Sequence, residues 1–452
     1  MAKTYITDFT QGSVSKQLLV FSAPLFLSNL LQVVYNLVDM VIVGQVAGEA
    51  GLSAVSIGGD VSSFLTFISM GFSSAGQVLI AQYIGAGCRD RIGKFISTMA
   101  SFLLTVALII SAVCLILREP ILHLMNTPAE SYAQTLDYAT VCMFGMVFIY
   151  GYNIAGAVLR GMGDSKHPFI FISLAAVLNV VLDILFVMYL DYGAKGAALA
   201  TVISQAVSFL SCSIFLLRNR EKYELKLHLA DFIRWDAAML SALIKLGIPM
   251  AIKSAAIHFS KLFVNSWINS YGVSVSAVAG IANKFNSISN LFSQAINTAG
   301  ASMVGQNIGA KKYSRVPKIM LTSFGVTLIV ATTLSLLVIG FPTAVFGIFT
   351  DKAEVLSVCM EYLPIAVVIF YGSSFRACMN ALINGSGNYR INFVTAILDG
   401  MILRIGLSVL FGLMMDMGYV GFWLGDALAG FTPFFIGIVY YFSGKWKKGQ
   451  VH

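Results

Sequence analysis

Long apolar stretches alternate with short polar segments along this 452-residue chain. Each apolar stretch is long enough to cross a bilayer as a helix, which takes about 20 residues. We count twelve of them, six in each half of the sequence. Their centres lie near Leu27, Phe67, Thr105, Phe144, Val177, Ser208, Ala256, Leu291, Ile329, Val368, Leu403 and Phe431. The pattern predicts an all-α polytopic membrane protein with twelve transmembrane helices.

The two halves of the chain resemble each other. Matching elements recur at a nearly constant offset of 224 or 225: Pro24 with Pro249, Gln82–Ala86 with Gln306–Ala310, Gly161 and Gly163 with Gly385 and Gly387, and Gly193 with Gly418. Six helices is an even number, so both halves enter the membrane in the same direction, as in a parallel repeat. We therefore expect two pseudo-symmetric six-helix lobes at residues 1–225 and 241–452, joined by a cytoplasmic linker at 226–240.

Composition and charge agree with a membrane protein. Only 11% of residues are charged and 58% are apolar, more than a water-soluble domain can bury. If the N-terminus is cytoplasmic, only Arg118, Lys195 and Lys352 fall in outside loops, while most other lysines and arginines lie inside. We expect a multi-pass protein of the bacterial cytoplasmic membrane with both termini inside. The net charge of +8 then reflects topology rather than nucleic-acid binding.

Polar residues within the first-half spans suggest an ion site, because ionisable groups are costly inside a bilayer. The candidate ion ligands are Asn36 and Asp39 in the first span, Asn179 and Asp183 on one face of the fifth, and Thr201, which opens the polar side of the sixth. Carboxylate, amide and hydroxyl oxygens suit Na⁺, and two neighbouring carboxylates equally suit H⁺. A structural hydrogen-bonded cluster is the alternative interpretation.

The second half carries different polar residues. At an offset of 225, Asp39 aligns with Val264 and Thr201 with Asp426; at 224, Asn179 aligns with Leu403 and Asp183 with Leu407. Polar stripes instead follow the seventh, eighth and tenth spans. The candidate substrate-cavity residues on them are Lys261, Lys284, His258, Arg376, Asn283 and Gln294. A cavity with this lining would favour substrates bearing a carboxylate or phosphate. The alternative is internal ion pairing of Arg404 or Arg376 with Asp399 and Asp426.

Pro24 and Pro249 lie inside the first and seventh spans at matching positions. Each removes a backbone hydrogen bond and should kink its helix. The kinks are either static or a pair of hinges.

Other chemistries leave no trace in the sequence. The six cysteines are scattered singly, without zinc or disulfide spacing, and there is no P-loop lysine motif. No HExxH motif or paired nucleophile and base points to a membrane enzyme. We expect no cofactor, no metal centre and no enzymatic activity, and a monomer whose partners are a small molecule, Na⁺ or H⁺, and the bilayer.

The Gln-x-Ile-Gly-Ala elements and the Arg160-Gly161-x-Gly163-Asp164 turn resemble the multidrug and toxic compound extrusion (MATE) family over nearly the whole chain. Asp39, Asn179, Asp183 and Thr201 resemble the first-lobe cation site of its DinF-like and archaeal branches. The resemblance implies a secondary active antiporter that extrudes small organic compounds, including drugs and other xenobiotics, in exchange for Na⁺ or H⁺ by alternating access. A lipid-linked or anionic-metabolite flippase of the same superfamily is the closest alternative, and a polytopic membrane enzyme is the alternative from another class.

Overall fold

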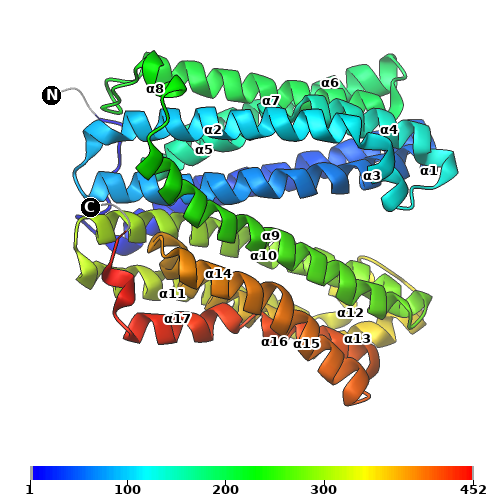
Figure 1. Cartoon of the computed structure of the whole chain (residues 1–452). Helices are drawn as coiled ribbons and strands as arrows, with labels where there is room; N and C mark the ends of the chain where they lie inside the picture. Colours follow the sequence, from blue (N-terminus) through cyan, green and yellow to red (C-terminus); the bar gives the residue numbers. More distant parts are fainter. Residues whose placement is uncertain (1–3, 450–452) are drawn as a thin grey trace. The chain divides into compact units, whose positions relative to one another are not determined.

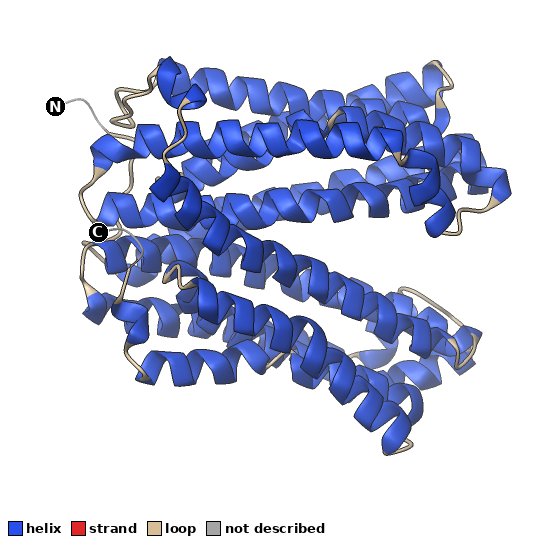
Figure 2. Ribbon diagram, viewed as in Figure 1, coloured by secondary structure: helices blue, strands red, loops and turns tan. Residues whose placement is uncertain are grey.

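The computed structural model describes residues 4–449, and every regular element within that range is helical (Figure 2). The chain forms two compact units. The first holds the stretch up to Thr7 together with Leu27–Gly247, and the second holds Asp8–Phe26 with the chain from Ile248 onward. This division differs from the expected boundaries, because the start of the first helix groups with the second half.

Helices account for nearly all of the first unit (Figure 1). They are the part of α1 (Val14–Gly85) from Leu27 on, α2 (Arg89–Ile116), α3 (Arg118–Leu124), α4 (Ala129–Phe144), α5 (Met146–Gly161), α6 (Lys166–Asp183) with the π-helical segment η1 (Ile184–Tyr189), α7 (Gly193–Arg218), the short α8 (Leu229–Ile233) and the start of α9 (Ala237–Asn269). The α7 helix packs against α4, α5 and α6 and so forms the centre of this bundle.

The second unit repeats this plan. It contains the start of α1, the rest of α9, α10 (Val273–Gly309), η2 (Tyr313–Arg315), α11 (Val316–Gly340), α12 (Pro342–Gly347), α13 (Ala353–Gly385), α14 (Tyr389–Ile397), the π-helical η3 (Leu398–Ile402), α15 (Leu403–Val409), the π-helical η4 (Leu410–Met414), α16 (Gly418–Ala429), α17 (Thr432–Phe442) and η5 (Lys445–Lys447). Here α13 packs against α10, α11, α16 and α17.

The expected number of spans agrees with these helices. Within residues 4–449, nine helices are long and apolar enough to cross a membrane, or ten if α4 and α5, bent by 51°, form one span. The α1 helix is really two, because Gly48 has φ 64° and ψ −158° inside it. Adding α10, which is 37 residues long but carries a polar stripe, brings the total to the predicted twelve.

The packing of glycines confirms the repeat. A Cβ atom at Gly161 would lie 2.8 Å from the Gln77 carbonyl oxygen, and one at Gly385 would lie 2.7 Å from that of Ala301. Gln77 and Ala301 are related by the same offset of 224 as the two glycines. Both positions therefore require glycine for the same close approach of two helices. In both halves a positive-φ glycine, Gly163 or Gly387, then ends the helix.

The offset between the halves changes from 224 to 225 within one helix. From Gln306 to Gly387 it is 224. Further on, the i→i−5 bond from Met415 N to Leu410 O matches that from Leu190 N to Leu185 O, at an offset of 225. Between them lies η3, a π turn with one more residue than an α turn, while α6 runs unbroken through the matching stretch. The extra residue is absorbed there, so Arg404 rather than Leu403 corresponds to Asn179, and Ser408 rather than Leu407 to Asp183.

The Gln-x-Ile-Gly-Ala element at the end of α10 anchors the segment before α1. Gln306 Oε1 accepts from Phe9 N at 2.9 Å, and Asn307 Nδ2 donates to Phe9 O at 3.1 Å. Arg315 donates to the carbonyls of Phe9 and Gly12 at 3.1 and 3.0 Å. Phe9 is buried in the second unit's core. These bonds explain why Asp8–Phe26 belongs to the second unit.

The linker packs on the first unit. Lys94 Nζ donates to Asp236 Oδ2 at 2.9 Å, and this hydrogen bond lowers the pKa of Asp236. Just before the linker, Tyr223 is fully buried and its hydroxyl donates to Asp164 Oδ2 at 2.5 Å. Burial and the neighbouring Asp164 carboxylate raise the pKa of Tyr223 well above its usual value. The linker is therefore an ordered part of the first bundle through Gly247.

Candidate functional site

The predicted ion-site residues of the first unit come from three helices. Asp39 lies on α1, Asn179 and Asp183 on the last turns of α6, and Thr201 on α7. Asp39 is 7% exposed, Asn179 2% and Asp183 0%, whereas Thr201 is half-buried. The sequence spacing on α6 and the contact between α6 and α7 bring the amide to the hydroxyl, and Asn179 Nδ2 donates to Thr201 Oγ1 at 3.4 Å.

The carboxylates of Asp39 and Asp183 interact electrostatically with each other, and Tyr138 of α4 interacts electrostatically with both. Both oxygens of Asp183, Oδ1 of Asp39 and Oδ1 of Asn179 are buried and make no hydrogen bond within the described part of the chain. Buried polar oxygens are costly unless they are satisfied. The set therefore fits a small cation or a proton, which would satisfy these oxygens and offset the negative charge.

The sequence prediction for this site needs one correction and several additions. Asn36, three residues before Asp39 on α1, is exposed and so lies outside the buried set. A small pocket opens beside Asn179 and Thr201, and its remaining lining comes from Tyr35, Tyr152, Ile172, Ala175, Ser204 and Gln205. Tyr35 lies one turn before Asp39 on α1, a spacing that the sequence shows, whereas nothing in the sequence marks Tyr152 or Gln205.

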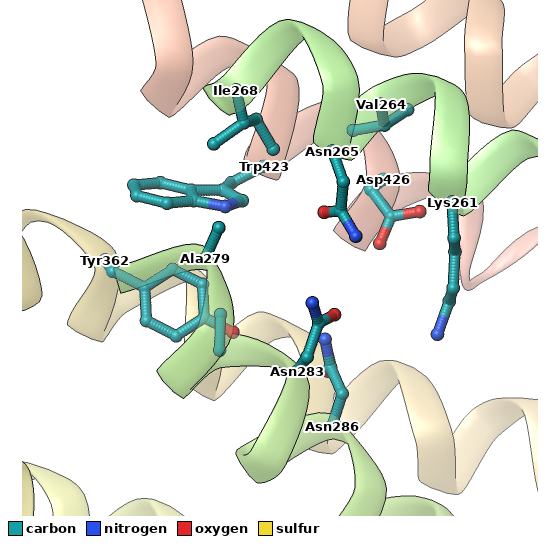
Figure 3. A pocket seen from close by; sticks show the side chains of 11 residues that line it. Lys261, Val264, Asn265, Ile268, Ala279, Asn283, Asn286, Tyr362, Trp423 and Asp426 are labelled. Carbon is teal, nitrogen blue, oxygen red and sulfur yellow. The ribbon is translucent and has the colours of Figure 1, made fainter. Parts of the chain in front are cut away.

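A second pocket lies wholly within the second unit (Figure 3). It is lined by Lys261, Val264, Asn265 and Ile268 of α9, Ala279, Ala282, Asn283 and Asn286 of α10, Tyr362 of α13, and Trp423 and Asp426 of α16. Figure 3 shows the rings of Tyr362 and Trp423 toward one end, the asparagine amides in the middle and Lys261 at the other end. The pocket thus joins an aromatic wall to polar donors and a cation.

Of the six predicted substrate-cavity residues, only Lys261 and Asn283 line this pocket. Lys284 and Gln294 are exposed, His258 is half-buried outside the pocket, and Arg376 takes part in an ion pair. The periodicity of a polar stripe tells which residues share a helix face. It does not tell toward which neighbour that face turns, which is why only part of the stripe lines this pocket.

The second unit contains the internal ion pairs that the sequence offered as the alternative to a substrate-binding lining. Arg404 is 2% exposed and holds both in-span carboxylates, through an NH2–Oδ1 bond to Asp399 of 3.1 Å and a close NH1–Oδ1 bond to Asp426. Arg376 NH2 lies 3.7 Å from Asp399 Oδ1, and its Nε donates to Gly430 O at 3.3 Å. Lys261 takes part in no ion pair of 4.0 Å or less among the described residues. The two carboxylates are therefore neutralised by Arg404 and Arg376 together.

Comparison with known proteins identifies the family to which this fold belongs. The family model MatE matches residues 24–185 and again residues 249–410, one match in each half. A probable multidrug resistance protein of Bacillus subtilis, YpnP, is 29% identical over 97% of both chains, and the multidrug export protein MepA of Staphylococcus saprophyticus is 23% identical over 91% of this chain and 90% of its own.

A solved MOP superfamily transporter from Pyrococcus furiosus has the same fold, with a TM-score of 0.91 and 21% identity over 99% of this chain and 100% of its own. The family matches cover most of this chain and reproduce its internal repeat. They identify a multi-pass membrane transporter rather than an enzyme. The chain belongs to the MatE family, that of the multidrug and toxic compound extrusion transporters.

Proposed function

We propose that the protein is a secondary active exporter that extrudes small organic compounds in exchange for Na⁺ or H⁺. The names of its relatives, multidrug resistance and multidrug export proteins, support the class of transport. The observation that carries the coupling is the pair of buried carboxylates, Asp39 and Asp183, since Oδ1 of Asp39 and both oxygens of Asp183 are buried without a hydrogen bond within the described residues. A bound cation or proton satisfies them, and its loss restores the charge repulsion.

The coupling follows from this charge change. With both carboxylates ionised, the site holds two negative charges in a buried place, which favours any arrangement that admits water or a cation. Binding of Na⁺ or a proton lowers that charge and favours an arrangement closed around Asn179 and Thr201. A coupling free energy of roughly 1–3 kcal/mol between ion and substrate is ordinary for such a system.

Pro24 and Pro249 are the hinges of this proposal. Two of the three boundaries between the compact units fall inside helices, between Phe26 and Leu27, just after Pro24, and between Gly247 and Ile248, just before Pro249; the third, between Thr7 and Asp8, precedes the first helix. The chain thus passes from one unit to the other inside a helix at each proline. A missing backbone hydrogen bond at that point makes bending easier. The positions support hinges better than static kinks, which would have no reason to coincide with unit boundaries.

The second-unit pocket is the proposed place for an acidic group of the substrate. Lys261 lines the pocket together with Asp426. Arg376, Arg404 and Lys253 lie outside its lining but interact with Asp399, so this part of the second unit holds four cationic side chains against two carboxylates. Lys253 Nζ donates a hydrogen bond to the neutral Asn380 amide oxygen at 2.7 Å and forms no ion pair of 4.0 Å or less with a described carboxylate. For the Pyrococcus furiosus transporter, a reverse polarity of the binding pocket has been taken to suggest a different function. An excess of positive charge favours an anionic or zwitterionic aromatic compound over a lipophilic cation.

Transport by reconstituted protein tests the coupling. Liposomes with an imposed Na⁺ or pH gradient should accumulate ethidium or 2-naphthoate only while the gradient lasts. Asp39→Asn and Asp183→Asn should each abolish that accumulation, and Asp137→Asn, at an exposed position on α4, should not. Gradient-driven transport at the wild-type level in both variants would refute the site.

Binding of 2-naphthoate, a carboxylate, and of tetraphenylphosphonium, a lipophilic cation, tests the substrate class. Lys261→Ala should weaken the binding of 2-naphthoate only, and Lys284→Ala, at an exposed position, serves as the control.

A further inference from the structure

The two repeats carry corresponding polar pairs between corresponding helices. In the first unit Asn179 of α6 bonds Thr201 of α7, and in the second Arg404 of α15 bonds Asp426 of α16. Both pairs have a sequence separation of 22, and both partners are shifted by 225. The π-helical turn η3 creates this register, since without its extra residue Leu403 would take the place of Arg404. The second unit therefore retains a counterpart of the Asn179–Thr201 pair of the ion site, although Val264 and Ser408 stand where the first unit has Asp39 and Asp183.

The counterpart is occupied by the chain itself. Arg404 donates to Asp399 at 3.1 Å and to Asp426, so its guanidinium lies between two carboxylates as a bound cation would. In the first unit, Asp39 and Asp183 have no cationic side chain within 4.0 Å among the described residues. An arginine keeps its charge at any physiological pH and cannot leave the site. A buried charge of this kind is stable only while its partners remain in place.

We propose that Arg404 is a built-in counter-ion that fills the second repeat's version of the ion site, so that this unit neither binds nor releases a coupling ion. The role of a coupling ion rests on the proposed function, whereas the position of Arg404 between the two carboxylates rests on its contacts alone. One consequence is that a transport cycle exchanges ions in the first unit alone. A second is that Asp426, held by Arg404, keeps a fixed position in the wall of the pocket that also contains Lys261.

Removal of the guanidinium tests the proposal directly. In an Asp39→Asn/Asp183→Asn background, which disables the first site, Arg404→Asn leaves Asp399 and Asp426 buried without their central cation. We expect a lower thermal unfolding midpoint, with a rise of about 3 °C or more when low millimolar guanidinium chloride or NaCl replaces choline chloride at equal ionic strength. The background with Arg404 intact should show no such rise. If guanidinium, Na⁺ and acid all leave the unfolding midpoint of the Arg404→Asn protein unchanged, the proposal is wrong.

Matched variants separate charge from packing. Arg404→Asn/Asp426→Thr recreates the Asn–Thr pair of the first unit and removes one charge of each sign, so it should fold without an added cation and ignore guanidinium. If the single variant fails to fold and this double variant folds, charge compensation is supported; if both fail, Arg404 is needed for packing and the proposal is wrong. Arg376→Ala should not respond to guanidinium, and an equal response there would also contradict the assignment. Failure of the proposed function would appear elsewhere, as ion-driven transport that survives in the background.

Discussion

At matching points of the two bundles, α6 brings an amide to a hydroxyl while α15 brings a guanidinium to a carboxylate. The first arrangement leaves carboxylate oxygens without partners among the described residues, and the second binds its carboxylates to an arginine that cannot dissociate. Duplication thus produced one fold twice, and substitution at a few positions gave the copies opposite chemistry. A site that must exchange its ion needs oxygens left unsatisfied by the protein. A site that only needs to be stable can carry its own cation.

The largest effect is expected when the arginine–carboxylate pair of the second unit is introduced into the first. Asn179→Arg/Thr201→Asp should place a built-in cation beside Asp39 and Asp183. We expect a folded protein whose gradient-driven transport falls at least about 100-fold, because the ion can no longer be exchanged. Uptake into liposomes measures this, with a thermal unfolding midpoint to show that the protein folds. Retained ion-coupled transport would mean that exchange does not occur at this position.

A substitution at the shared glycines sharpens the comparison, since it should affect both units alike. Gly161→Ala and Gly385→Ala each place a Cβ atom against a backbone oxygen of a neighbouring helix, at 2.8 and 2.7 Å. Overpacking of this kind costs about 1–3 kcal/mol. The two variants should lower the thermal unfolding midpoint by similar amounts, and Gly325→Ala, where the added atom meets open space, should not. A strong effect in one unit only would show that the helices do not pack equivalently.

The linker, which is bound to the first unit, and the segment at Phe9, which is bound to the second, should differ in how their stability responds to pH. Asp236 holds the linker through Lys94, and this hydrogen bond lowers its pKa. Its contribution to stability is therefore complete above the ordinary carboxyl range and is lost as pH falls through the lowered value. The effect should be under about 1 kcal/mol, because the pair is partly exposed.

Hydrogen exchange at pH 7 and at about pH 3 measures this difference. Protection of the linker should fall on acidification, and Asp236→Asn should reduce protection at neutral pH while matching the wild type in acid. Protection of the segment at Phe9, held by amide and guanidinium bonds to backbone carbonyls, should be unchanged. Loss of protection at Phe9 alone would contradict the assignment.

The smallest expected difference concerns the turns after the Gln-x-Ile-Gly-Ala elements. Gly87 and Lys311 occupy matching left-handed positions, with φ of 75° and 57°. A lysine there is strained, so Lys311→Gly should be neutral or stabilising by up to about 1 kcal/mol, whereas Gly87→Lys should destabilise by a similar amount. Thermal unfolding of the two variants checks the pair, and a destabilised Lys311→Gly protein would show that its side chain makes a compensating contact.

Much of this picture could be read from the sequence. The repeat, the twelve helices and the burial of Asp39, Asn179 and Asp183 follow from apolar run lengths and from the cost of polar groups in a bilayer. The change of offset between Gly163/Gly387 and Gly193/Gly418 even signalled one extra residue in the second half. Its position did not follow, because a π turn has no strong sequence signature, and Arg404 therefore went unmatched to Asn179.

Other features needed three-dimensional contacts. The segment Asp8–Phe26 joins the second unit through bonds to side chains far along the chain, such as Phe9 to Gln306, a separation of 297. Lys284 and Gln294 share a helix with pocket-lining residues yet are exposed, since spacing along a helix does not fix which face meets a neighbour. The Tyr152 side of the first pocket depends in the same way on how α5 packs against α7.

Ion stoichiometry tests the central claim most directly. Purified protein should take up about one coupling ion per chain, measured as bound ²²Na⁺ or as protons absorbed when the pH is lowered, since only the first unit has an open site. Asp39→Asn/Asp183→Asn should take up none, and Arg404→Asn in that background should regain uptake. Two ions per wild-type chain, or uptake unchanged in Asp39→Asn/Asp183→Asn, would contradict the division of roles between the two units.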